Sequence, residues 1–172
     1  MWNLNKFKNN IAVITENNEH ITYEKLNNYC IELTSNIKKR CLVFNLCANE
    51  IGSLVGYIGF LNAKIVPVML KADLDEILLT NMIETYKPAY LHLPSILADR
   101  FDKFEKVYSN IGYTLLKTNF IEEFELNEDL ALLLTTSGST GSPKLVRQSY
   151  KNIEANTKSI VEYLQLNETE RA

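Results

Sequence analysis

Apolar and polar residues alternate in blocks along the chain, and the blocks predict strands and helices in turn. The apolar runs 41–46, 65–70 and 131–135 have no regular polar alternation, which is typical of strands buried on both faces of a parallel sheet. Between the first two runs, residues 49–63 are largely apolar and predict a buried helix. This order is a β-α-β unit, the repeating element of α/β folds.

The rest of the chain continues the alternation, with breaks at prolines and polar turns. Helices are predicted at 74–86, 95–104 and 149–164, strands at 89–93 and 113–117, and a surface link over the acidic stretch 122–129. We therefore expect an α/β fold in which a mostly parallel sheet has helices on both faces.

The N-terminal region predicts a small antiparallel hairpin ahead of this sheet. Two short strand-like runs, 11–15 and 20–23, flank a turn-rich segment. Thr22 can then cap a helix. The apolar face of that helix is formed by residues at helical spacing, namely Leu26, Tyr29, Cys30, Leu33 and Ile37.

Composition and charge narrow the possible functions. The 172 residues carry 18 Lys+Arg against 21 Asp+Glu, a net charge of −3, so there is no basic field to hold a nucleic acid.

The most apolar segment, 51–61, is shorter than the roughly 18 residues that cross a bilayer. Its Gly52 and Gly56 could form a membrane dimer face, but we favour close packing of the helix on the sheet. We expect no membrane span.

Cysteine usage argues against a metal centre in this chain. Cys30, Cys41 and Cys47 are odd in number and form no C-x-x-C pair, and both histidines are distant in sequence. Free, mostly buried thiols are typical of a reducing compartment. The N-terminus has no apolar run long enough for a signal peptide. We therefore expect no metal-binding residues here and a cytoplasmic location.

The segment that carries chemistry is 136–144, which follows the apolar run 131–135. It contains two of the six glycines, several hydroxyls and a terminal lysine. Glycine lets successive backbone N–H groups point into one concavity and approach phosphate oxygens, and hydroxyls and an ammonium add donors. A loop after a buried parallel strand lies at the carboxyl edge of the sheet, where open α/β folds bind ligands. The sequence therefore predicts a phosphate-binding loop.

This loop differs from the best-known phosphate loops. The pattern G-x-x-x-x-G-K-[ST] requires a second glycine five residues after Gly138, where this chain has Pro143. The loop is also separated from the helix that starts near Ser149, so the helix dipole contributes less than in a dinucleotide-binding site. Backbone donors and Lys144 are expected to carry most of the binding.

Residues Thr136–Lys144 resemble the signature loop of the adenylate-forming enzymes, which include acyl- and aryl-CoA synthetases, carrier-protein adenylation domains and luciferases. That signature reads Thr-Ser-Gly-[Ser/Thr]-Thr-Gly-x-Pro-Lys, and the chain fits it at each specified position, with Ser142 in the variable slot. Two weaker similarities, at 21–27 and 61–68, stand in the family's order. The resemblance covers essentially the whole chain, but only the N-terminal part of a typical family member.

The resemblance implies that the parent protein activates a small carboxylic acid with ATP, forms an acyl-adenylate, and passes the acyl group to a thiol such as CoA or a carrier protein. It implies ATP and Mg²⁺ as cofactors, with the metal ligand outside this chain. The phosphate-binding residues that it implies are Thr136, Ser137, Gly138, Ser139, Thr140, Gly141 and Lys144, and it makes Lys144 catalytic as well.

The chain departs from the family pattern after the loop. Leu145 stands where the family commonly has glycine, and Tyr150 where it often has a histidine near the acyl pocket. Tyr150 can equally serve as an apolar helix residue. The family's downstream segments for adenine, ribose and metal have no counterpart in the sequence. We therefore interpret 1–172 as a single incomplete N-terminal AMP-binding subdomain, which ends just after the helix that follows the loop.

Two other functions stay open at this point. A noncatalytic interaction module would keep the fold and lose adenylation. A phosphotransferase would use a similar phosphate loop, although no catalytic Asp has a recognisable setting. In each case we expect negligible activity from the isolated chain. Surface that the rest of such an enzyme normally covers would favour a dimer.

Overall fold

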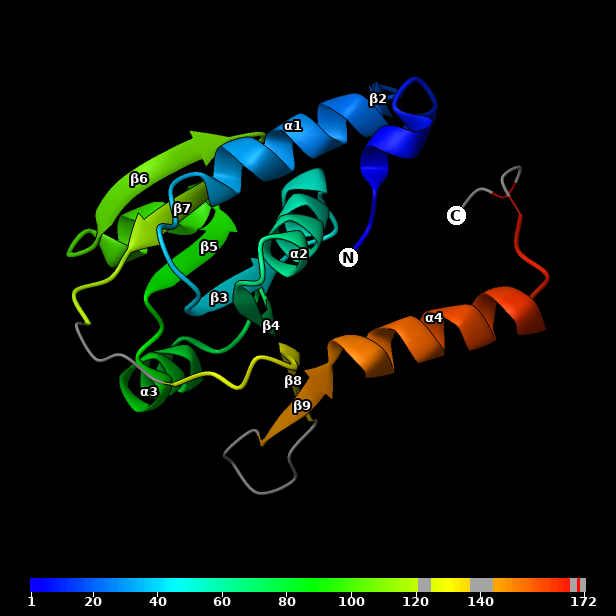
Figure 1. The fold of residues 1–172 in the computed structure, drawn as a ribbon. Coiled ribbons are helices and arrows are strands. Elements are labelled where there is room, and N and C mark those ends of the chain that lie inside the picture. The colour runs from blue at the N-terminus through cyan, green and yellow to red at the C-terminus, as the bar shows by residue number, and fades with distance from the viewer. Residues whose placement is uncertain (121–124, 137–143, 168–169, 171–172) are drawn as a thin grey trace.

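The computed structural model describes residues 1–120, 125–136, 144–167 and 170, and it contains a large sheet with helices around it and a small separate hairpin (Figure 1). The helical elements are the 3-10 helices η1 (Leu4–Phe7) and η2 (Ser95–Phe101) and the α-helices α1 (Tyr23–Thr34), α2 (Ile51–Asn62), α3 (Glu76–Tyr86) and α4 (Tyr150–Tyr163). The strands are β1 (Ile11–Ile14), β2 (His20–Thr22), β3 (Leu42–Cys47), β4 (Val66–Lys71), β5 (Tyr90–Pro94), β6 (Glu105–Asn110), β7 (Tyr113–Lys117), β8 (Leu130–Thr135) and β9 (Leu145–Ser149).

The large sheet has the strand order β6-β7-β5-β3-β4-β8-β9. Its four central strands, β5, β3, β4 and β8, pair in parallel. At the edges, β7 pairs antiparallel with β5, β6 with β7, and β9 with β8. The α/β fold and the N-terminal hairpin of β1 and β2 are confirmed. The sheet is mixed rather than mostly parallel, because antiparallel strands extend both ends of the parallel centre.

The sequence pattern does not predict β6 or β9. Both strands are at or near the edges of the sheet and have several exposed residues, so they lack the continuous apolar runs that mark the central strands. The residues between the predicted loop and α4 are therefore the returning strand of a hairpin.

Side-chain alternation along β3 divides the core into two parts. Leu42, Phe44 and Leu46 belong to the cluster covered by α3 and η2. Val43 belongs to the cluster formed with α1 and α2. Figure 1 shows α1 and α2 on one side of the sheet and α3 on the other, so the prediction of helices on both faces is confirmed.

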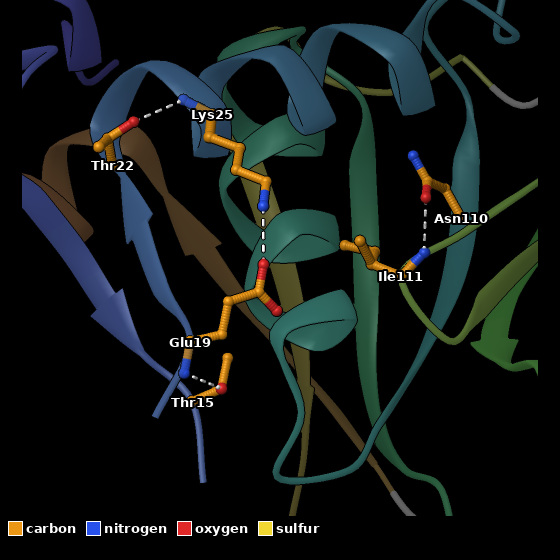
Figure 2. Close-up of polar contacts among 6 residues, drawn as sticks. All are labelled: Thr15, Glu19, Thr22, Lys25, Asn110 and Ile111. Carbon is orange, nitrogen blue, oxygen red and sulfur yellow. Dashed lines mark hydrogen bonds and ion pairs between the residues drawn. The ribbon is translucent and has the colours of Figure 1, made fainter. Parts of the chain in front are cut away.

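The start of α1 is fixed by a cap and by an ion pair to the hairpin (Figure 2). Thr22 Oγ1 accepts a hydrogen bond from the backbone N–H of Lys25 at 3.2 Å, which confirms the predicted cap. Lys25 Nζ donates to Glu19 Oε1 at 2.7 Å. The same figure shows the turn between β6 and β7, where Asn110 Oδ1 accepts from the backbone N–H of Ile111.

The predicted apolar face of α1 extends beyond the helix itself. The helix ends at Thr34, and Ile37 follows it, although the Ile37 side chain still joins the buried cluster. Ser35 Oγ and Asn36 Nδ2 both donate to the Glu32 carbonyl, at 2.8 and 2.7 Å. Such side-chain bonds compete with the helical ladder and favour its end.

Two glycines let α2 lie directly on the sheet. A Cβ at Gly52 would be 2.1 Å from Tyr113 Cδ2, and one at Gly56 would be 2.7 Å from both Asn45 Oδ1 and His92 Nδ1. Atoms do not approach so closely, so close packing of α2 on the sheet, the favoured interpretation of these glycines, is confirmed. In the described part of the chain, α2 included, no helix has the length and apolar character to cross a membrane.

A buried polar cluster lies beneath α2. His92 Nδ1 is 2.7 Å from Asn45 Oδ1, and because an amide oxygen only accepts, the neutral ring donates from Nδ1. Asn45 Nδ2 donates to the Ser53 carbonyl at 3.4 Å, and the Tyr113 hydroxyl lies 2.6 Å from Ser53 Oγ. Burial lowers the pKa of His92 to about 3. The cluster is therefore uncharged at neutral pH.

Gly56→Ala is expected to lower the free energy of unfolding by about 1–3 kcal/mol, because the new methyl must displace Asn45 or His92. Gly59→Ala is the matched control. A Cβ at Gly59 would be 3.4 Å from Cys30, an ordinary contact, and the higher helix propensity of alanine favours the variant by up to about 1 kcal/mol. Denaturant unfolding measures both. Equal stability of the two variants would contradict the close approach of α2.

Stability is expected to fall as the pH decreases from about 6.5 toward 3. The unfolded chain binds a proton at His92 near pH 6.5, whereas the folded chain binds it only near pH 3. Protonation of the unfolded state therefore costs up to about 1.4 kcal/mol of stability per pH unit in that window. NMR titration of the His92 ring tests the cause. A His92 ring that titrates near pH 6.5 in the folded chain is the contrary result.

Candidate functional site

The β8–β9 hairpin lies at the carboxyl edge of the parallel strands. β8 pairs in parallel with β4, so the two strands end at the same edge. β9 returns antiparallel from Leu145, whose register partner is Thr135. The predicted loop 136–144 therefore connects the two strands of this hairpin at the edge where open α/β sheets bind ligands.

Thr136 and Lys144 are the predicted site residues that the structure describes, and they face each other at the base of the loop. The backbone N–H and the hydroxyl of Thr136 both donate to the Lys144 carbonyl, at 3.0 and 3.3 Å. Both side chains are exposed. The other predicted phosphate-binding residues lie outside the described residues and stay predictions: Ser137, Gly138, Ser139, Thr140 and Gly141.

A second lysine stands at the same edge. Met69 of β4 and Leu134 of β8 are register partners. Two positions further along each strand come Lys71, the last residue of β4, and Thr136. Lys71 is therefore level with the base of the loop, on the neighbouring strand. Lys71 carries no local sequence signal, but it can be found from the rule that parallel strands present their carboxyl ends at one edge.

The described part of this edge can attract an anion. Lys71 and Lys144 bring two positive charges to it, and an ammonium binds phosphate as a point charge. Across the ranges that the structure covers, no three His, Cys, Asp or Glu side chains are grouped so as to hold a metal ion.

The three cysteines are free, as their number and spacing predict. Burial raises the pKa of the Cys30 thiol to about 12 and those of Cys41 and Cys47 to about 11. These thiols are therefore neutral and poor nucleophiles near pH 7.

A hollow of about 90 Å³ lies between α3 and η2. Its lining includes Leu79, Ile83 and Phe104, and it contains neither Thr136 nor Lys144.

Leu145 and Tyr150, the two departures from the family pattern, both have structural roles. Leu145 begins β9 opposite Thr135 and is partly buried in the cluster on the α3 side. The Tyr150 ring packs in the cluster that contains Leu61, and its hydroxyl donates to the Leu61 carbonyl at 3.4 Å. Lys64 Nζ lies 4.0 Å from the centre of the same ring. Of the two interpretations of Tyr150, the structure favours a packing residue at the start of α4.

The family model described as AMP-binding enzyme matches residues 1–172. The chain belongs to this AMP-binding enzyme family. Membership confirms the resemblance from which the loop residues were assigned. Among curated proteins, none matches the chain.

Solved structures with this fold are similar to the chain over most of its length. O-succinylbenzoate coenzyme A synthetase (MenE) from Bacillus subtilis, in complex with AMP, matches 94% of it with a TM-score of 0.67 and 19% identity. Apo MatB from Rhodopseudomonas palustris matches 93% with a TM-score of 0.73 and 18% identity. A fatty acyl-adenylate ligase from L. pneumophila, with acyl adenylate and pyrophosphate, matches 87% with a TM-score of 0.63 and 22% identity. The chain covers 44%, 36% and 28% of these structures, which is less than half of each.

Tyr150→Ala is expected to lower the free energy of unfolding by about 1–3 kcal/mol, because the partly buried ring loses its packing on Leu61 and its contact with Lys64. Tyr150→Phe removes the hydroxyl alone and should cost less than about 1 kcal/mol. Tyr163→Ala is the control, since that side chain is 86% exposed, and it should change stability by less than about 0.5 kcal/mol. A loss in Tyr150→Ala no larger than in the control would argue against the packing role.

Proposed function

We propose that this chain is the N-terminal, phosphate-binding part of an ATP-dependent ligase that activates a carboxylic acid as its acyl-adenylate. The observation that carries the proposal is the β8–β9 hairpin, in which Thr136 and Lys144, at the base of the loop, lie at the carboxyl edge of the parallel strands. Family membership supports the general kind of reaction. Similar structures were solved with AMP, with ATP and magnesium ion, and with acyl adenylate and pyrophosphate, which supports a nucleotide substrate.

The proposed reaction has two steps. A carboxylate oxygen of the acid attacks the α-phosphorus of ATP, the bond from that phosphorus to the β-phosphate oxygen breaks, and pyrophosphate leaves. In the second step, a thiol of CoA or of a carrier protein attacks the acyl carbonyl carbon. AMP then leaves with the bonding electrons, and the thiol proton passes to solvent.

The signature loop acts in the first step, where it holds the β- and γ-phosphates as pyrophosphate departs. Lys144 supplies a positive charge for the leaving group, and Lys71 adds a second at the same edge. Preorganised donors stabilise such developing charge by roughly 3 kcal/mol each. The proposed donors are the hydroxyls of Thr136, Ser137, Ser139 and Thr140 and the backbone N–H groups of Gly138 and Gly141.

Magnesium would accompany the triphosphate. Because the described residues hold no acidic cluster for it, we propose that phosphate oxygens and groups outside the described residues bind the ion. A bound magnesium ion would neutralise part of the phosphate charge. The residues described here contribute the lysines and the hairpin that orient the phosphates.

We also propose that residues 1–172 form a single subdomain, and that other parts of such an enzyme supply the adenine, ribose and acyl contacts. α4 leads away from the sheet (Figure 1). It carries exposed apolar side chains, of which Ile160 and Val161 are 44% and 42% exposed. Such side chains would favour a dimer of the isolated chain.

Lys144→Ala is expected to weaken the binding of magnesium pyrophosphate to the 172-residue chain at least about tenfold, because a charge-assisted contact is lost. Isothermal titration calorimetry measures this affinity. Lys151→Ala, at an exposed position of α4, is the matched control and should bind like the wild type. Equal affinities of the Lys144→Ala variant and the wild type would contradict the role of Lys144.

The same lysine can be tested in an enzyme that contains this chain as its N-terminal part. There, Lys144→Ala should slow acid-dependent exchange between ATP and pyrophosphate. ATP consumption without release of pyrophosphate would favour a phosphotransferase. Absence of nucleotide binding by that enzyme would favour the noncatalytic interaction module.

A further inference from the structure

Arg40, in the segment between α1 and β3, joins parts of the chain that are far apart in sequence. Its Nη1 donates to the carbonyl of Lys64, in the turn between α2 and β4. Its Nη2 donates to the carbonyls of Asn127 and Leu130, at 2.8 and 2.7 Å, which lie 87 and 90 residues further along the chain. The guanidinium therefore bridges from the end of α2 to the first residue of β8.

The turn 127–130, which Arg40 holds, is also bonded to the residue that follows β9, the second strand of the hairpin. The Leu130 N–H donates to the Asn127 carbonyl at 3.0 Å and closes the turn, and the Tyr150 N–H donates to the Asp129 carbonyl at 3.2 Å. Leu130 begins β8, and Tyr150 follows the last residue of β9. One short turn thus connects Arg40 to both strands of the hairpin that bears the predicted phosphate loop.

β8 is in register with the parallel strands along only part of its length. β8 pairs with β4 at two described register positions, and β9 is an edge strand whose sheet neighbour is β8. A register shift interrupts the β8–β9 ladder between Leu130 and Leu132. Because Leu133 and Leu134 are the β8 residues in register with β4, the Arg40 contacts to Asn127 and Leu130 act at the end of β8 that this ladder does not reach.

The chemistry of a guanidinium suits this bridge. It presents donors on several sides of one rigid plane, so one group can hold carbonyls from two separate turns. Arg40 Nε is buried and has no hydrogen-bond partner among the described residues. An unpaired buried donor is destabilising, and the three charge-assisted contacts of the other nitrogens offset that cost.

We propose that Arg40 is a positioning residue for the phosphate loop. By clamping the turn 127–130 to the turn between α2 and β4, it fixes the base of the β8–β9 hairpin on the parallel sheet. It acts through the strands, from the end of the hairpin opposite to Thr136 and Lys144. The inference rests on the proposed function for what the hairpin carries, whereas the clamp is a property of the ligand-free chain.

Hydrogen exchange of the ligand-free 172-residue chain tests the clamp. In Arg40→Met, amides of β8 and β9 should exchange about tenfold faster than in the wild type, because the base of the hairpin is released. Amides of β3 and β5 should change less than about threefold. Arg100→Met, which removes an exposed arginine of η2, is the control and should leave both groups unchanged. Equal acceleration across the sheet, or none in β8 and β9, would overturn the proposal.

Arg40→Lys is the second variant, which keeps the charge and removes the planar fork. Its exchange in β8 and β9 should fall between those of the wild type and Arg40→Met, and exchange identical to the wild type would overturn the bridging role. Calorimetry with magnesium pyrophosphate then links the clamp to the loop. Weaker binding by Arg40→Met supports the positioning role, and unchanged affinity despite a loosened hairpin overturns it. A wild-type chain that does not bind pyrophosphate contradicts the proposed function. The hydrogen-exchange rates of the ligand-free chain test the Arg40 clamp independently of that result.

Discussion

The parallel contact between β8 and β4 is the constraint on which the candidate site depends. It brings the end of β8 to the same edge as the end of β4, so Thr136 lies level with Lys71. It also makes β9 the outer strand, from which α4 leads away from the sheet (Figure 1). The ladder there is short, and burial of Leu132 and Leu133 on the two faces of β8 supplies further attachment. The three carbonyl contacts of Arg40 hold the start of the same strand.

The parallel sheet that receives β8 is itself held by an unusually close helix. The absence of side chains at Gly52 and Gly56 lets α2 approach Tyr113, Asn45 and His92. The polar groups in this contact bond to one another, and burial keeps His92 uncharged because its pKa falls to about 3. This tight, neutral contact packs α2 directly on residues of β3, β5 and β7.

The central strands and the helix starts could be predicted because their signals are local. A continuous apolar run marks a strand buried on both faces, and a hydroxyl residue before a helical pattern marks a cap, as Thr22 does for α1. The edge strands β6 and β9 carry no such run. Lys71 is brought to the site by the order of the strands. Arg40 acts through a contact with the Leu130 carbonyl, 90 residues further along the chain. No local sequence pattern encodes either. The loop residues were assigned by resemblance, and Thr136 and Lys144 are those that the described structure places.

The claim that the β8–β9 hairpin holds phosphate is tested most directly by NMR of the chain during titration with magnesium pyrophosphate. We predict that the largest backbone amide shifts occur at Thr136, Lys144 and Lys71, while the hollow lined by Leu79 and Phe104 changes little. Largest shifts at that hollow, or bound pyrophosphate without shifts at the hairpin, would contradict the claim.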